Sequence, residues 1–150
     1  MDKKILDKAW DAYEKEDYAT ALKEWRPLAE KGNAEAQYNL GVVYADGNGV
    51  VQDYKEALKW YRLAAEQGYA VGLHSLGAMY NEGTGVIQDY KEAVKYFKLA
   101  AEKGFLHSQY NLGLMYVHGK GVTQDKVLAH MWWNIAASHG YKNAKKDKDT

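Results

Sequence analysis

Cysteine is absent from this chain of 150 residues, and proline occurs once, at Pro27. The absence of cysteine excludes disulfide bonds, thiolate metal ligands and thiol nucleophiles. Charge of one sign is not in excess either, because 20 lysines and arginines balance 20 aspartates and glutamates. No net electrostatic field therefore favours nucleic acid or an anionic membrane surface as a partner.

Long apolar runs are also missing, and none approaches the roughly 20 residues that a bilayer-spanning helix needs. The charged opening Met1-Asp2-Lys3-Lys4 lacks the apolar segment of a secretory signal. We expect a soluble chain, cytoplasmic as it stands, or periplasmic or secreted if a leader was removed. Alanine, leucine, lysine, glutamate and tyrosine dominate instead, and this mixture predicts an all-α protein.

Three blocks of 36 residues repeat along the chain, at residues 34–69, 70–105 and 106–141. Residues 2–33 follow the same phase and form a fourth, shorter unit. A fixed period of this length is typical of solenoids, in which neighbouring units bury each other's apolar faces. We expect a single domain over residues 1–150 that ends in a basic tail, 142–150. The most regular positions carry leucine and glycine, namely Leu40, Leu76 and Leu112 followed by Gly41, Gly77 and Gly113.

Each block divides into two helices joined by a glycine-rich turn. Ala36, Leu40 and Tyr44 recur at four-residue spacing and form the apolar stripe of the first helix. Asp53 precedes the second helix, with Glu56 three residues later, which is the arrangement of a capping box. Stacked pairs then give a right-handed α/α superhelix, a solenoid of about four antiparallel helix pairs. The second glycine of each turn is expected at positive φ, and these glycines are Gly49, Gly85 and Gly121.

The pattern A-x-x-x-L-G-x-x-Y-x-x-G-x-G-V-x-x-D-x-x-x-A, followed by A-A-x-x-G, resembles the Sel-one-like repeat (SLR) family. This family is a relative of the tetratricopeptide repeat with a longer loop between its helices. The opening unit, AWDAYEKEDYATALKEW, is more similar to a tetratricopeptide motif. The resemblance implies a bacterial, non-catalytic adaptor or scaffold that holds partner proteins on a curved surface, and it assigns no catalytic residue.

The last block departs from the pattern, because it reads MWWNIAASHG where the first reads KWYRLAAEQG. This variant resembles the terminal repeats of bacterial members, in which a further helix usually follows. We therefore expect that the natural chain continues beyond this sequence. Without that helix, Trp132, Trp133 and Ile135 would be short of a capping partner, so this end is expected to meet another molecule. The alternative to a scaffold is thus a structural or self-assembling module that forms homo-oligomers through its C-terminal end.

Signatures of catalysis or cofactor binding are not found. The five histidines do not share the one-face spacing of a zinc-binding H-x-x-x-H helix. The Gly47-Asn48-Gly49 turn follows a helix rather than a strand, so it does not match a phosphate-binding loop. Lysines of the second helices alternate with glutamates, which indicates a solvated face. We expect no enzyme activity, no metal, no cofactor, no nucleic-acid partner and no membrane insertion.

The variable positions of the first helices carry the binding hypothesis. By analogy with tetratricopeptide repeats, these positions line the concave side, where aromatic rings and amides would clamp a protein or an extended peptide. The competing interpretation is that tight packing between repeats buries some of these rings. The predicted partner-binding residues are Trp10, Tyr13, Tyr38, Asn39, Val42, His74, Ala78, Asn81, Tyr110, Asn111, Leu114 and His118.

Overall fold

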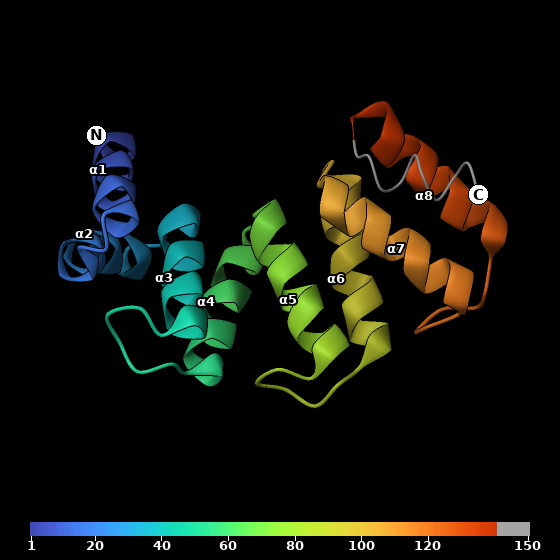
Figure 1. Cartoon of the computed structure of the whole chain (residues 1–150), viewed down its shortest axis with the longest axis horizontal. Coiled ribbons are helices and arrows are strands. Elements are labelled where there is room, and N and C mark those ends of the chain that lie inside the picture. The colour runs from blue at the N-terminus through green and yellow to red at the C-terminus, as the bar shows by residue number, and fades with distance from the viewer. Residues whose placement is uncertain (141–150) are drawn as a thin grey trace. The chain divides into compact units, whose positions relative to one another are not determined.

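The computed structural model describes residues 1–140, which form eight α-helices of 13 residues each (Figure 1). No strand occurs in this range, so the all-α prediction is confirmed. The predicted basic tail, 142–150, lies outside the described residues. The helices are α1 (Asp2–Glu14), α2 (Tyr18–Glu30), α3 (Ala34–Asp46), α4 (Tyr54–Glu66), α5 (Ala70–Glu82), α6 (Tyr90–Glu102), α7 (Leu106–His118) and α8 (Lys126–Ser138).

Helix boundaries follow the repeated sequence signals. At the start of α4, one carboxylate oxygen of Asp53 accepts hydrogen bonds from the backbone amides of Lys55 and Glu56 at 3.0 and 3.2 Å. Asp89 caps α6 in the same way, which confirms the predicted N-caps. Gly47 ends α3 in the left-handed conformation, where a residue with a Cβ is disfavoured. The expected positive φ is also confirmed, at 77° for Gly49, 72° for Gly85 and 73° for Gly121.

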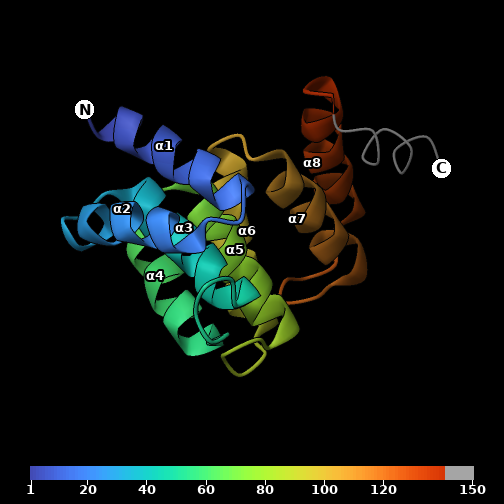
Figure 2. The same cartoon turned by 60° about the vertical axis from the view of Figure 1, so that its left-hand side comes forward.

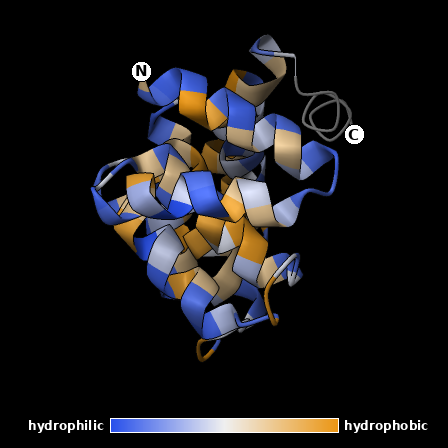
Figure 3. Ribbon diagram, turned by 90° about the vertical axis from the view of Figure 1, so that its left-hand side faces the viewer, coloured by the Kyte–Doolittle hydropathy of each residue, from blue (hydrophilic) through white to orange (hydrophobic). Residues whose placement is uncertain are grey.

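The chain divides into two compact units, residues 1–72 and 73–150, and the boundary falls within α5. In the first unit α1 packs on α2, α2 on α3 and α3 on α4 (Figure 2). Its core contains Trp25, Leu40 and Val43, each with at most 1% of its surface exposed. Apolar and polar stretches alternate along the helices, as Figure 3 shows, so one side of each helix is available for this core.

In the second unit α6 packs on α7 and α7 on α8. The core between them contains Phe97, Leu112 and Met115. Each unit thus has an apolar core of buried side chains between its helices. The helices follow one another as sequential pairs, which is the arrangement that the 36-residue period predicts.

A glycine inside each first helix faces an aromatic ring of the second helix. A Cβ built on Gly41 would lie 2.5 Å from Cδ1 of Tyr61, and one built on Gly77 would lie 2.8 Å from Cδ1 of Phe97. A Cβ on Gly113 would collide with the indole of Trp133. The missing side chain therefore lets the ring lie directly against the helix backbone, which offsets the low helix propensity of glycine.

The two tryptophans of α8 turn toward their own unit. Trp133 is buried and its Nε1 donates a hydrogen bond to the backbone oxygen of Tyr110 at 3.2 Å. Trp132 is half-buried and packs against the cluster that contains Leu112 and Met115. The expectation that these two rings lack a packing partner is therefore wrong, because the glycine at 113 makes room for the second of them.

Candidate functional site

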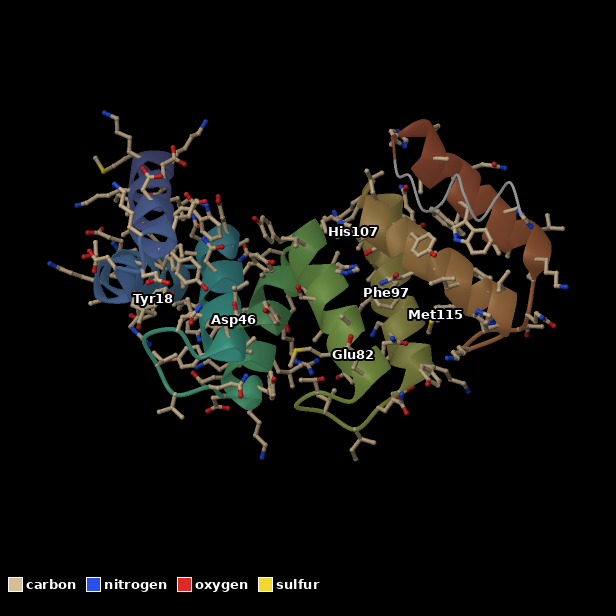
Figure 4. The ribbon with its side chains drawn as sticks, viewed as in Figure 1. Tyr18, Asp46, Glu82, Phe97, His107 and Met115 are labelled. Atoms are coloured by element: carbon tan, nitrogen blue, oxygen red, sulfur yellow. The ribbon has the colours of Figure 1, made fainter. Side chains whose placement is uncertain are left out.

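A groove of about 450 Å³ opens between α5 and α7 in the second unit. Figure 4 shows Glu82, Phe97 and Met115 around this space. A volume of this size fits a short stretch of peptide or a small ligand. Its walls and floor are formed by Asn81, Glu82, Phe97, Asn111, Leu114, Met115, His118 and Lys120.

The floor of the groove is apolar and rigid. Phe97 comes from α6 and is 1% exposed, while Met115 comes from α7 and is 5% exposed. The position of Phe97 depends on Gly77, whose missing side chain leaves room for the ring. Leu114 is half-buried beside them. Packed side chains of this kind offer an apolar partner group a preformed surface.

Two amide side chains stand on the walls above this floor. Asn81 and Asn111 are half-buried, and neither side-chain amide makes a hydrogen bond to any of residues 1–140. Each amide carries two donor hydrogens and one acceptor oxygen. The backbone oxygen of Asn81 is already occupied, because it accepts a hydrogen bond from Nε2 of Gln88 at 2.9 Å. The unused hydrogen-bonding groups of these two asparagines are therefore their side-chain amides.

Charged groups lie at the rim of the groove. Glu82 ends α5, and His118 and Lys120 lie at the end of α7 and in the loop that follows it. All three are exposed, so solvent screens the charges of Glu82 and Lys120. Lys120 is held in place by Tyr90, since Nζ lies 5.4 Å from the centre of the tyrosine ring. The rim thus carries one acidic and two basic side chains around an uncharged interior.

Four of the predicted binding residues meet in this groove, namely Asn81, Asn111, Leu114 and His118. The other three from this unit do not line it. Tyr110 packs against Trp133 with ring centres 6.2 Å apart, and Ala78 packs against the core of the unit. For these residues the interpretation as packing groups fits the structure better than a role in binding.

His74 is also a packing residue. Its Nδ1 lies 2.7 Å from Oγ of the buried Ser108, and its ring centre lies 5.3 Å from that of Phe97 and 5.0 Å from that of Phe105. Burial lowers the pKa of His74 from 6.5 to about 4, and the nearby His107 adds to the effect. His74 is therefore neutral at physiological pH and packs against the core of the unit, and its role in binding a partner stays a prediction.

The predicted residues of the first unit mostly pack against one another. The rings of Tyr13, Trp10 and Trp25 form a cluster, in which the centre of the Tyr13 ring lies 5.4 Å from that of Trp10 and 5.5 Å from that of Trp25. The Tyr13 hydroxyl accepts a hydrogen bond from Nδ2 of Asn48 at 2.8 Å. Trp10 itself remains 42% exposed. Aromatic stacking therefore holds this part of α1 in place.

On α3 the predicted residues also pack within the chain. Tyr38 lies 5.6 Å from the ring of Tyr61 and 5.8 Å from that of Tyr69. Burial raises the pKa of Tyr61, and Tyr38 contributes to the shift. Asn39 is 7% exposed, while Val42 is half-buried. That any of these residues binds a partner stays a prediction.

Four groove residues, Glu82, Phe97, Met115 and Lys120, were not predicted from the sequence. The repeat register holds a signal for Phe97, because it occupies the position of Tyr61 and Trp133 in the other blocks. No such signal marks Lys120, which lies in the loop after α7 and contacts the ring of Tyr90.

Neither a metal-binding cluster nor a membrane-spanning helix is found in residues 1–140. Within residues 1–140, no group of three or more His, Asp or Glu side chains could hold a metal ion. Among the eight described helices, none is long and apolar enough to span a bilayer.

The repeat seen in the sequence and in the helix pairs matches a known family model. The Sel1 repeat model matches residues 34–69, 70–105 and 106–141. The chain belongs to the Sel1 repeat family. Sel1 repeats generally mediate protein interactions. Among curated proteins none matches this chain.

Solved structures of bacterial SLR proteins share the fold. The protective antigen c5321 of uropathogenic Escherichia coli is 38% identical, with a TM-score of 0.91 over 96% of this chain. The chain spans 32% of the length of that protein. A Sel1 repeat protein from Oxalobacter formigenes is 38% identical, with a TM-score of 0.80 over 85% of this chain and 96% of that one. Helicobacter pylori cysteine rich protein B, at 21% identity and a TM-score of 0.69, covers 87% and 93% of the two chains and shares the fold alone. The SLR solenoid fold is thus confirmed.

Proposed function

We propose that this chain is a non-catalytic scaffold that binds an extended peptide segment of a partner protein in the groove between α5 and α7. The observation that carries the proposal is the pair of unused amides, Asn81 and Asn111, above the apolar floor of Phe97 and Met115. Because both side chains are half-buried rather than buried, water can solvate their amides in the free chain, and a ligand can replace that water with direct hydrogen bonds.

An extended peptide matches these groups better than a compact small molecule does. Its backbone offers an N–H and a C=O at every residue, and an asparagine side chain can pair with both. Side chains of an extended segment alternate between two sides, so one of them would point to the apolar floor while its neighbours face the rim. Glu82 and Lys120 would then favour peptides that carry charged side chains next to the one on the floor. Because both residues are exposed, this preference would act mainly on the association rate.

The proposal is tested with two variants and a peptide array. Replacing Asn81 and Asn111 together by alanine should weaken binding of any captured peptide at least about tenfold, since each lost hydrogen bond contributes about 1 kcal/mol. The matched control is Ser75→Ala, because Ser75 occupies the repeat position of Asn111 but does not line the groove. The melting temperature of both variants should equal that of the wild type.

Two results would contradict the proposal. Equal peptide affinity for the wild type and the double variant would show that the groove amides are not used. Mass spectrometry of the peptide after incubation should find it chemically unchanged, and a cleaved or modified peptide would overturn the non-catalytic role.

A further inference from the structure

The outer face of α8 is apolar although it is exposed. Val127 is 79% exposed and Met131 is 41% exposed. Together with His130, Asn134 and Ile135 they line a shallow open depression of about 580 Å³. Of the charged residues, only Lys126 lies along this surface, at the N-terminal end of the helix. We call this surface, formed by Lys126, Val127, His130, Met131, Asn134 and Ile135, the α8 face.

The other second helices carry ion pairs at the same repeat positions. In α4, Nζ of Lys59 lies 3.5 Å from a carboxylate oxygen of Glu56. In α6, Nζ of Lys95 lies 3.9 Å from a carboxylate oxygen of Glu92. In α8 both members of the pair are apolar, because the glutamate position holds Leu128 and the lysine position holds Met131.

Two further positions change in the same direction, although Lys126 adds a charge where α4 and α6 carry Tyr54 and Tyr90. Lys55 and Lys91 correspond to Val127, and Arg62 and Lys98 correspond to Asn134. These positions carry charged side chains in the first two repeats, and all of them are uncharged in the third. A coordinated loss of charge across one continuous helix surface is typical of a surface that packs against protein.

A second copy of this chain fits the α8 face. Val127 lies four residues before Met131 and Ile135 lies four residues after it. The apolar stripe therefore presents an apolar side chain at the same distance from Met131 toward either end of the helix. Two α8 helices related by a twofold axis near Met131 would place Val127 of one copy beside Ile135 of the other. No carboxylate lies on the face, and the ammonium group of Lys126 can reach water at the edge, so no charge is buried.

A head-to-tail arrangement fits less well. The opposite end of the sequence, α1, carries a charged surface on which Lys4, Asp7, Lys8 and Asp11 lie together. Packing this surface on the α8 face would desolvate those charges against a surface that has no carboxylate and a single ammonium group. We therefore propose that two copies of the chain associate through their α8 faces and form a closed, twofold-symmetric dimer.

Sedimentation velocity over a range of protein concentrations tests this dimer. The wild type should convert reversibly from monomer to dimer as the concentration rises. Replacing Val127 and Met131 together by lysine restores the residues that α6 carries as Lys91 and Lys95, so the helix should tolerate both changes. This variant should remain monomeric with unchanged helicity. A matched control, Lys55→Gln with Lys59→Gln on α4, should dimerise like the wild type.

Disulfide trapping tests the geometry, since the natural chain has no cysteine. A Met131→Cys variant should form a covalent dimer on mild oxidation, whereas Lys95→Cys at the same repeat position of α6 should not. A wild type that is monomeric at every concentration, unchanged association in the double lysine variant, or a ladder of larger species would each overturn the proposal. The variant that combines Asn81→Ala with Asn111→Ala should still dimerise. The proposal of a peptide groove and the proposal of a dimer are therefore tested independently.

Discussion

The two units of the molecule use the same repeat positions in different ways. Asn39 in the first unit and Asn111 in the second are the same amino acid in the same register. Asn39 is 7% exposed, whereas Asn111 stands half-buried on the wall of a groove with its amide unused among residues 1–140. Register therefore does not by itself decide which positions stay open to solvent; the neighbouring side chains do.

What the units share is the contact between a helix glycine and an aromatic ring. Gly41 faces Tyr61 in the first unit, and Gly113 faces Trp133 in the second. The shared contact fixes the two helices of a pair, and the variable positions around it are either filled by packing or left open. The predictions below test first the shared contact and then the differences.

The largest effect is expected where this contact is broken. Gly41→Ala and Gly113→Ala should each lower the free energy of unfolding by about 2–3 kcal/mol, because a methyl group would overlap a buried ring. Urea unfolding measures the change. Gly72→Ala is the control, since its Cβ would lie 3.1 Å from Cβ of Ala64, and a gain in helix propensity of up to about 1 kcal/mol offsets this contact. Equal effects at all three glycines would contradict the shared contact.

The interhelix turns should show the next largest effect. Gly85→Val should lower the free energy of unfolding by about 1–3 kcal/mol, because φ is 72° there and a β-branched residue disfavours that region. Gly49→Val should cost more, since a Cβ at Gly49 would also lie 2.6 Å from Cβ of Tyr18. Thermal unfolding of the two variants compares the turns directly. A Gly85→Val variant as stable as the wild type would exclude a conformational role for this glycine.

Most of the fold could be predicted from the sequence because its signals are local and repeated. Asp53 and Asp89 cap their helices as their positions relative to the apolar stripe suggest. The turn glycines have positive φ, since only glycine adopts that conformation at little cost. The period then places each helix pair, because the same signals return after 36 residues.

The candidate site could be predicted only in part, because it depends on contacts between distant residues. His74 was expected to face a partner, but it packs against Ser108, which lies 34 residues further along the chain. Lys120 lines the groove from a loop, and its ammonium group lies over the ring of Tyr90 on another helix. The inward position of Trp133 could have been inferred, since it shares its register with Tyr61 and both face a glycine.

His74 gives the second unit a pH dependence that its counterpart Tyr38 does not give the first. Its pKa is about 4 in the folded chain and 6.5 ordinarily, so between these values only the unfolded chain binds the proton. Stability therefore falls as the pH is lowered from about 6.5 to 4 and levels off below. The ring is partly exposed, so solvent screening limits the loss to about 1–2 kcal/mol.

A His74→Gln variant isolates this contribution, because glutamine can keep a hydrogen bond to Ser108 but does not titrate. Urea unfolding at several pH values should show the wild type losing stability relative to the variant across this window. His107, whose charge opposes protonation of His74, is unchanged in the comparison. Parallel pH profiles for the two proteins would contradict the burial of a neutral His74.

The smallest effect concerns a buried glutamine that both units carry. Nε2 of Gln37 donates to the backbone oxygen of Ala29 at 3.1 Å, and its side-chain oxygen accepts from Gln67 at 2.9 Å. Gln109 makes the equivalent bond to Ala101 at 3.1 Å, but its oxygen has no partner among residues 1–140. The middle block has leucine at this position, Leu73, which is 3% exposed.

Leucine should therefore be tolerated differently in the two units. Gln37→Leu removes two hydrogen bonds and should lower the free energy of unfolding by about 1–2 kcal/mol. Gln109→Leu removes one bond and also the unpaired buried oxygen, and it gains apolar burial, so the change should stay within about 0.5 kcal/mol of zero. The oxygen of Ala101 keeps a partner in either case, because it also accepts from the amide of Gly104 at 3.0 Å. Urea unfolding of both variants decides the point, and an equal loss would mean that the oxygen of Gln109 is satisfied in solution.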